Sequence, residues 1–180
     1  MKVNMERLVD VPEGVQVTIS GNDVSVSKDR KLIKRSFDCG KVKIATKDDK
    51  VSISAEKATK RELKMLGTIN AHIKNMIKGT SEDFVYELEI CNVHFPMQVK
   101  VDGQTLRIKS FLGEKVDRIA KILPDVKVEV NGNKVEVRSS YVEAAGQTAA
   151  NIEKATKVRN RDRRVFQDGI FITSKPGRKI

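Results

Sequence analysis

The sequence contains the same pattern of alternating residues twice, in its two halves. Residues 15–27 read VQVTISGNDVSVS and residues 97–109 read MQVKVDGQTLRIK, and they align without a gap at an offset of 82. Apolar residues occupy every second position on both sides of a turn that contains Gly21 or Gly103. This pattern is typical of a β-hairpin with one buried face. The aligned pairs are Gln16 with Gln98, Val17 with Val99, Ile19 with Val101, Gly21 with Gly103, Val24 with Leu106, and Val26 with Ile108.

Two further segments repeat in the same order. Residues 42–54 read VKIATKDDKVSIS and residues 126–138 read VKVEVNGNKVEVR, at an offset of 84. Asp48-Asp49 and Gly132-Asn133 fill the two turns, so β-hairpins are again expected. Chance alternation could imitate one match, but two matches in the same order indicate an internal duplication. The matching apolar residues are Val42 with Val126, Ile44 with Val128, Val51 with Val135, and Ile53 with Val137.

Each second hairpin runs into a segment whose apolar residues recur at helical spacing. One amphipathic helix can cover the apolar face of an antiparallel sheet. The sequence therefore predicts an α+β fold of two duplicated domains, each a small antiparallel sheet covered by a helix. The helical residues are Leu63, Leu66, Ile69, Ile73, Met76 and Ile77 in the first half, and Val142, Ala145, Ala149 and Ile152 in the second.

The boundary between the two halves is expected at residues 78–83, where small and acidic residues follow the first helical pattern. We therefore expect an N-terminal α+β domain at residues 1–81 and its repeat at residues 82–157. Beyond them, residues 158–180 are expected to form a basic C-terminal extension that packs on the second domain.

The charge of the chain is concentrated near its C-terminus. The 180 residues carry a formal net charge of +11, and residues 154–180 alone hold nine Lys or Arg against two Asp. The other 153 residues are closer to balance, with 26 basic and 22 acidic side chains. A concentrated positive field of this kind indicates a polyanionic partner such as nucleic acid.

Four arginines of this basic segment lie within six positions. Guanidinium groups suit phosphate recognition, because they form two parallel hydrogen bonds with phosphate oxygens and neutralise a charge that otherwise holds counterions. The alternative is a solvated charged surface without a partner. The arginines are Arg159, Arg161, Arg163 and Arg164.

Apolar residues interleave with these charges. Val165, Phe166 and Phe171 are expected to be buried and to anchor the segment on the domain, with a turn at Asp168-Gly169. Residues 175–179, which carry Lys175, Arg178 and Lys179, are predicted to be an extended arm that becomes ordered only on a partner.

Catalytic motifs do not stand out. The sequence contains no P-loop, dinucleotide fingerprint or nucleophile elbow, and its carboxylates alternate with Lys and Arg as on a solvated surface. With two Tyr, six Phe and no Trp, the chain offers few platforms for stacking unpaired bases. If the polyanion is a nucleic acid, recognition by shape and backbone is therefore favoured over reading of single strands.

The cysteines and histidines indicate neither disulfides nor a strong metal site. Cys39 and Cys91 are far apart in sequence and are expected to be reduced. With His72 and His94 they could supply four zinc ligands, but structural zinc sites normally take their ligands as two close pairs.

Residues 1–10 mix charged with apolar residues and lack a secretion signal, so the protein is expected to remain inside the cell. No membrane, cofactor or small-molecule substrate is expected.

The basic segment also carries a resemblance to a known family. RDRRVFQDGIFITSKPG, preceded by GQTAANIEKATK at residues 146–157, closely resembles the C-terminal region of the large-subunit ribosomal protein six family, archaeal and eukaryotic type. The Pro-Glu-Gly-Val sequence at residues 12–15 matches the start of that family's first domain, and the family is likewise built from two duplicated α+β domains. The Tyr-Lys-Gly-Lys-Gly segment of bacterial members is absent, so their detailed contacts cannot be transferred.

The resemblance implies a non-enzymatic protein that binds large-subunit ribosomal RNA mainly through its C-terminal domain, beside other ribosomal proteins and near the region that translational GTPases approach. Two alternatives remain open, namely a nucleic-acid-modifying enzyme and a free RNA chaperone or DNA-binding module. The expected RNA contacts are Gly146, Gln147, Arg163, Arg164 and Lys175 from the resemblance, and Lys157, Arg159, Arg161, Arg178 and Lys179 from charge.

Overall fold

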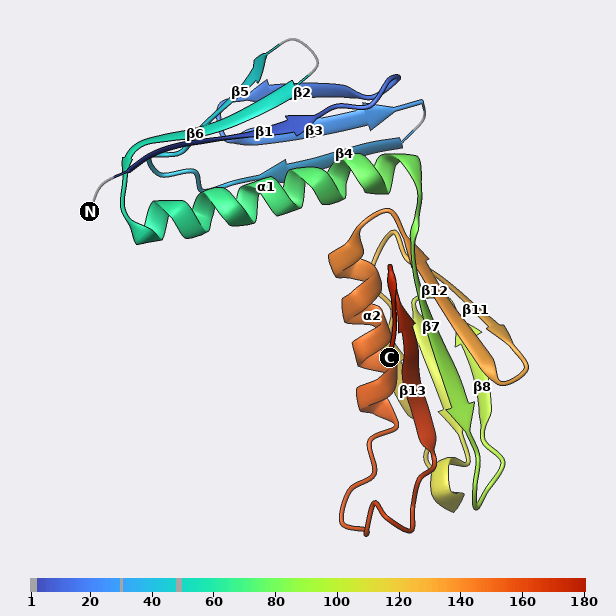
Figure 1. Ribbon diagram of the computed structural model, residues 1–180. Helices are drawn as coiled ribbons and strands as arrows, with labels where there is room; N and C mark the ends of the chain where they lie inside the picture. Colours follow the sequence, from blue (N-terminus) through green and yellow to red (C-terminus); the bar gives the residue numbers. More distant parts are fainter. Residues whose placement is uncertain (1–2, 30, 48–49) are drawn as a thin grey trace. The chain divides into compact units, whose positions relative to one another are not determined.

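The computed structural model describes residues 3–29, 31–47 and 50–180. The chain divides into two compact units, Met1–Glu82 and Asp83–Ile180 (Figure 1). The first unit contains β1 (Val3–Asp10), β2 (Gln16–Ser20), β3 (Asp23–Lys28), β4 (Lys31–Ser36), β5 (Lys43–Lys47), β6 (Lys50–Ala58) and α1 (Lys60–Ser81). The second contains β7 (Phe84–Cys91), β8 (Gln98–Asp102), β9 (Thr105–Lys109), the short 3₁₀ helix η1 (Phe111–Gly113), β10 (Arg118–Lys121), β11 (Lys127–Asn131), β12 (Lys134–Ser139), α2 (Val142–Ala155), β13 (Gly169–Lys175) and β14 (Arg178–Lys179).

Each unit has two antiparallel sheets with one helix packed on both. In the first unit the strand orders are β1-β6-β5 and β2-β3-β4, and α1 contacts β1, β3, β4 and β6. In the second unit the orders are β11-β12-β7-β13-β14 and β10-β9-β8, and α2 contacts β7, β10, β12 and β13. Figure 1 shows α1 along the strands of the first unit and α2 beside β13 in the second. The predicted α+β class with a duplicated sheet and helix is confirmed.

The duplication extends to the pairing register. Val17 of β2 pairs with Val26 of β3, and Val99 of β8 pairs with Ile108 of β9. Val17 and Val99 therefore occupy equivalent strand positions, as the offset of 82 predicts. The turn predicted at Asp48-Asp49 lies outside the described residues.

Sequence alternation does not reveal every strand. The predicted connection between the two hairpins contains β4 in the first unit and β10 in the second, and each unit begins with a further strand, β1 or β7. Strand β7 reads FVYELEIC and lies between β12 and β13, while only Val9 is buried in the charged strand β1. Charged residues interrupt the alternation in β1, which is the signal on which strand prediction depends. Strand β7 does alternate from Tyr86 to Ile90, but both of its partner strands lie far away in the sequence, so no local hairpin marks it.

Helix α2 lies very close to strand β7. A Cβ atom at Gly146 would come within 2.9 Å of the Tyr86 hydroxyl oxygen, so any other residue there would have to displace this side chain. Ala145, Ala149 and Ile152 are fully buried on the same helix, and they join a core with Leu106, Ile108, Val135, Val137 and Ile170. Small residues on α2 therefore allow helix and sheet to approach each other closely.

No helix in the described part of the chain is long and apolar enough to cross a membrane.

The basic segment is built into the second unit. Strand β13 pairs with β7 from Gly169 to Ser174 and extends the sheet that β7 forms with β12, so β13 is an integral strand of the second unit. The prediction of an extended arm at residues 175–179 is wrong, because β14 pairs with β13 and the Ile180 N–H donates to the Thr173 carbonyl at 2.9 Å. Pro176-Gly177 forms the intervening turn, with Gly177 at φ +78°, a conformation that glycine adopts without strain.

Candidate nucleic-acid interface

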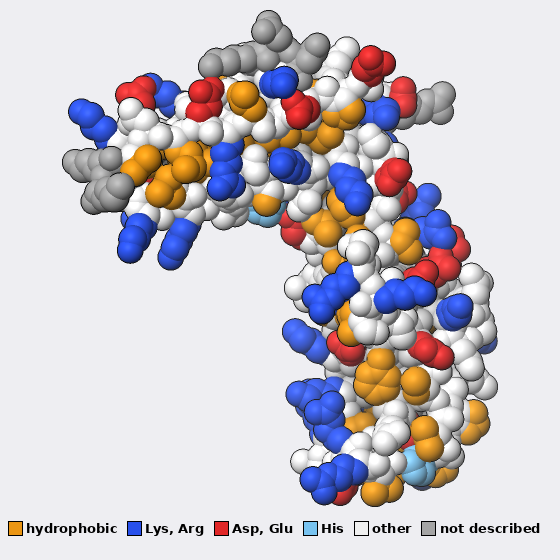
Figure 2. Space-filling model, viewed as in Figure 1, with side chains coloured by type: hydrophobic (Ala, Val, Ile, Leu, Met, Phe, Trp, Pro, Cys, Tyr) orange, Lys and Arg blue, Asp and Glu red, His pale blue; other side chains and the backbone are white. Residues whose placement is uncertain are grey.

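The predicted arginines lie on the connection between α2 and β13, residues 157–167, which we call the arginine loop. All four arginines are exposed. Asp162 shapes the turn that carries them, because its carboxylate accepts the Arg164 N–H at 2.9 Å and its carbonyl accepts the Phe166 N–H at 2.9 Å. On the face drawn in Figure 2, Lys and Arg side chains gather at the end of the second unit where this loop lies. The loop thus presents a local concentration of guanidinium groups to solvent.

A buried carboxylate anchors the far end of the arginine loop. Asp168 is only 1% exposed, and one of its oxygens accepts the N–H groups of Val93 and His94, both at 2.8 Å. Its other oxygen lies 2.6 Å from Nδ1 of His94. Burial alone would raise the pKa of Asp168, but the N–H groups of His94 and Val93 and the His94 ring hold this pKa below its ordinary value. These bonds fix the loop to the segment that follows β7.

A stack of rings connects this anchor to the arginines. The His94 ring stacks on Phe166 with centroids 4.9 Å apart, and the Arg161 guanidinium lies 4.8 Å from the Phe166 centroid. Arg161 is therefore held partly in place by a cation–π contact. An arginine that is ordered before binding loses less conformational freedom when it meets a phosphate.

Acid should weaken the Asp168 anchor. Since the pKa of Asp168 is lower in the folded than in the unfolded chain, this group stabilises the fold above about pH 4, and that stability is lost as the pH falls through the folded value. Asp168→Asn should lower the free energy of unfolding of the second unit at neutral pH by about 1–3 kcal/mol. It should also reduce the loss of stability below about pH 4.

Chemical denaturation of the full chain over a pH series would measure both effects. The matched control is Asp125→Asn, because Asp125 is an exposed carboxylate at φ +59°, a conformation that asparagine also adopts. An Asp168→Asn variant that unfolds like the control at every pH would contradict the anchoring role of Asp168.

The C-terminal end of α2 holds the beginning of β13. Thr156 Oγ1 accepts the Ile170 N–H at 2.9 Å, and Glu153 Oε1 accepts the Ile172 N–H at 3.3 Å. Arg118 caps the C-terminal end of the same helix, because its guanidinium donates hydrogen bonds to the carbonyls of Ala155 and Lys157 at 2.9 and 3.1 Å. These side-chain hydrogen bonds connect α2, the arginine loop and strand β13.

The expected apolar anchors differ from those in the structure. Val165 is 57% exposed and Phe171 is 39% exposed, so the prediction that they anchor the segment by burial is wrong. Phe166 is half-buried against His94, whereas Ile170 is completely buried. Side chains alternate across a strand, and Ile170, with the partly buried Ile172, lies on the face of β13 that packs against the core.

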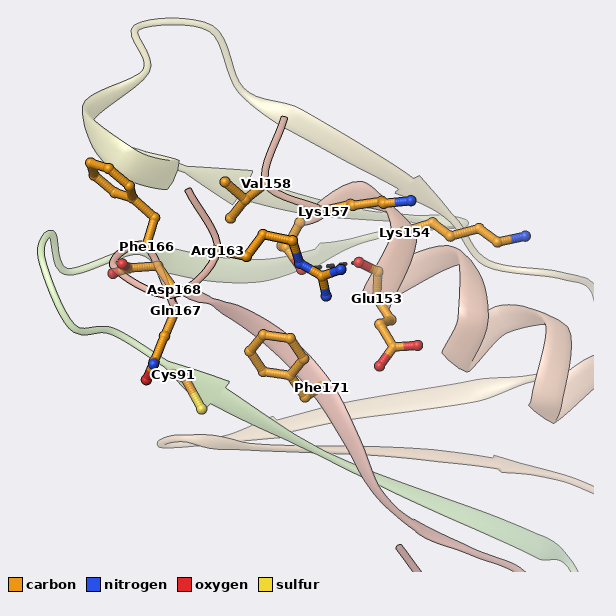
Figure 3. Close-up of a pocket in the computed structure, with 11 residues that line it drawn as sticks. Cys91, Glu153, Lys154, Lys157, Val158, Arg163, Phe166, Gln167, Asp168 and Phe171 are labelled. Carbon is orange, nitrogen blue, oxygen red and sulfur yellow. Dashed lines mark hydrogen bonds between the residues drawn. The ribbon is translucent and has the colours of Figure 1, made fainter. Parts of the chain in front are cut away.

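A cavity of about 660 Å³ opens beside the arginine loop. Its walls come from the end of β7, the end of α2, the loop itself and the start of β13 (Figure 3). Phe166 and Phe171 supply apolar surface, and Glu153, Lys157 and Arg163 supply charge. Sequence reasoning missed Glu153 and Lys154 and expected Phe171 only as a buried anchor, because only the folded helix and strand bring these residues to the same place as the arginines.

The other predicted contact residues are spread over the second unit. Lys157 and Arg163 line the cavity, whereas Gly146 contacts Tyr86 and so has a packing role. Gln147 is exposed on α2 and its amide donates to Asn151 at 2.9 Å. Lys175, Arg178 and Lys179 are exposed on the β13–β14 hairpin, where Lys175 pairs with Arg178. Arg159 and Arg164 are exposed on the arginine loop.

The four candidate zinc ligands do not gather. Cys39 and His72 belong to the first unit, while Cys91 and His94 belong to the second. Within residues 3–29, 31–47 and 50–180, no three His, Cys, Asp or Glu side chains are placed to hold a metal ion. His94 is already occupied by Asp168 and Phe166.

Comparison with known proteins identifies the family. The sequence profile of ribosomal protein L6 matches residues 11–83 and residues 95–169, which is most of both units. The chain belongs to the ribosomal protein L6 family. One curated relative, large ribosomal subunit protein uL6 of Methanosarcina mazei, is 44% identical over 97% of this chain and 99% of its own length. The protein of the same name from Methanococcus vannielii is 45% identical over 96% of this chain and 94% of its own length.

The ribosomal protein L6 profile skips part of each unit. In the first unit it leaves out residues 1–10, which include strand β1, and in the second unit residues 84–94, which include strand β7, and residues 170–180, which include most of strand β13. The archaeal uL6 relatives nevertheless align over nearly the whole chain. The resemblance to the archaeal and eukaryotic type of this family, inferred from the basic segment, is therefore confirmed for the chain as a whole.

Proposed function

We propose that this protein binds large-subunit ribosomal RNA through its second unit, with the arginine loop as the main contact with phosphates. Its L6 family is structural and not enzymatic, and the curated relatives are named large ribosomal subunit proteins. The chain is accordingly a structural constituent of the large ribosomal subunit, and it resides with the cytoplasmic ribosome. Neighbouring ribosomal proteins are further partners.

One observation carries the proposed RNA contact. Four exposed arginines lie on a single loop whose two ends are fixed, at Thr156 by a hydrogen bond to β13 and at Asp168 by bonds to Val93 and His94. A row of guanidinium groups on an anchored loop matches a phosphate backbone, because each group can neutralise one phosphate while the ends of the loop stay in place.

We also propose that the protein lies near the region of the large subunit that translational GTPases approach. This position follows from the family resemblance of the basic segment. Cross-linking of assembled large subunits in the presence of a translational GTPase would test it, with residues of the arginine loop as sites for the photoreactive group. Cross-links exclusively to RNA and distant proteins would contradict it.

The two units should differ in RNA binding. A fragment of residues 83–180 should bind a large-subunit RNA fragment with a steep dependence on salt, because it contains the arginine loop. A fragment of residues 1–82 should bind more weakly and with a smaller salt slope. In its basic stretch, residues 28–50, Lys and Arg are interrupted by Asp29, Asp38, Asp48 and Asp49.

Filter binding of both fragments across a salt series would measure this difference. Circular dichroism of each fragment would establish that it is folded before binding is compared. Equal affinities and equal salt slopes for the two folded fragments would contradict the assignment of the contact to the second unit.

A further inference from the structure

We propose that the cavity beside the arginine loop holds one unpaired nucleotide of the bound RNA, with its base on Phe171 and its phosphate near Lys154 and Lys157. This inference rests on the proposed RNA binding and adds a specific ligand to it. The cavity has about 660 Å³, within the range of pockets that enclose small organic ligands. A nucleotide in this cavity would be displaced from its own helix, as is usual where proteins recognise RNA bases.

The apolar wall offers a flat surface for a base. The Phe171 ring is 39% exposed, and Figure 3 shows it facing the same space as the Arg163 guanidinium. The ring lies directly over Gly169, where a Cβ atom would come within 2.9 Å of it, so the absence of a side chain at Gly169 leaves room for the ring. A ring that is ordered and partly exposed can stack with a base, and stacking on an aromatic side chain tolerates any base.

Three positively charged side chains lie around the rim of the cavity, where they can bind an anion. Lys154 lies in the last turn of α2, Lys157 begins the arginine loop, and Arg163 extends from further along the same loop (Figure 3). Both lysines are exposed, so they are available to a phosphate oxygen. An apolar wall with three cations around it matches a nucleotide, whose base is flat and whose phosphate is negative. An apolar protein side chain would leave these cations without a partner.

Glu153 gives the cavity a preference among bases. Its Oε1 accepts the Ile172 N–H at 3.3 Å, which directs the carboxylate along the cavity wall. A carboxylate accepts hydrogen bonds and donates none, so it favours bases with exposed amino groups. Guanine presents two adjacent donors on one edge, whereas the single N–H of uracil lies between two carbonyl oxygens that repel a carboxylate. Guanine should therefore bind better than uracil.

The probes for this inference are four RNA hairpins with one single-nucleotide bulge, G, A, C or U, and one fully paired hairpin of the same stem. The full-length protein should bind the G-bulged hairpin at least about fivefold more tightly than the paired one, since stacking of one base on an aromatic ring contributes roughly that much or more. Among the four bulges, U should raise the affinity over that of the fully paired hairpin the least. The Ile172 amide should shift in NMR spectra with the G-bulged hairpin, because this amide donates to Glu153.

Two variants separate the roles of the side chains. Phe171→Leu keeps apolar bulk over Gly169 but removes the aromatic face, so it should abolish the preference for bulged over paired hairpins. Glu153→Gln retains an acceptor for the Ile172 N–H but removes the charge, so it should reduce the difference between G and U while bulged hairpins still bind better. Melting temperatures close to that of the parent protein are expected for both variants.

The outcomes distinguish this inference from the proposed function. If the protein binds paired and bulged hairpins equally, with a steep salt slope and no shift of the Ile172 amide, the nucleotide pocket is overturned and the arginine contact stands. If no hairpin is bound in a salt-dependent way, RNA binding itself fails. A preference for bulges that survives Phe171→Leu in a folded protein would also overturn the pocket.

Discussion

Replacing Arg163 and Arg164 together with alanine is expected to flatten the salt dependence of RNA binding. Each phosphate contact contributes about 0.7 to 0.9 to the slope of log affinity against log salt, so the loss of two contacts should reduce this slope by roughly 1.5. Affinity near physiological salt should fall by about tenfold or more. Both arginines are exposed, and the Arg164 backbone keeps its bond to Asp162 in the variant, so the fold should be retained.

The measurement is binding of the full chain to a large-subunit RNA fragment across a salt series, together with its melting temperature. The matched control removes two positive charges from the exposed side of α1, with Lys60→Ala and Lys64→Ala, and its slope should change much less. An unchanged slope with a collapsed melting temperature in the arginine variant would show that Arg163 and Arg164 stabilise the protein and do not bind phosphates.

Ile170→Ala is expected to destabilise the second unit by about 2–5 kcal/mol. Ile170 is completely buried in β13, and truncation of such a side chain loses its transfer free energy and leaves a cavity. The same strand offers a control, because the neighbouring Phe171 lies on the other face of the strand, lines the cavity and is 39% exposed. Phe171→Leu should lower the free energy of unfolding by less than about 1 kcal/mol.

Chemical denaturation followed by circular dichroism would compare the two variants with the parent protein. RNA binding by Ile170→Ala should weaken only under conditions where the second unit is partly unfolded. If Ile170→Ala were no more destabilising than Phe171→Leu, β13 would not be a core strand, and the tail would be the loosely packed extension that its composition predicts.

Local patterns explain which parts of the fold could be predicted. The hairpins β2–β3, β5–β6, β8–β9 and β11–β12 were predictable, because in each the two paired strands are close neighbours in the sequence and show their buried face as alternation. Strand β13 was not, because its partner β7 lies about 80 residues earlier in the chain and no local signal records that pairing. The basic composition of the neighbouring residues also concealed the buried Ile170.

The candidate site was also predictable only in part from the sequence. The arginines were predictable, because four of them within six positions is a property of the sequence alone. The cavity depends on Glu153 of α2, Phe171 of β13 and Cys91 of β7, which meet only after β13 has paired with β7. Asp168 was expected only as part of a turn, and its role as a buried anchor arises from contacts with residues 74 and 75 positions away.

The pairing of β7 with β13 has a consequence for the order of events during synthesis of the chain. Every strand pair of the first unit joins residues within 3–58, so that unit can fold early as the chain emerges. In the second unit, β7 must wait with one edge open until residues 169–175 have been made. Asp168 and Ile170 fix the arginine loop, so the nascent chain should acquire its organised RNA-binding surface late. This delay would keep incomplete chains from competing with finished ones for their site on the RNA.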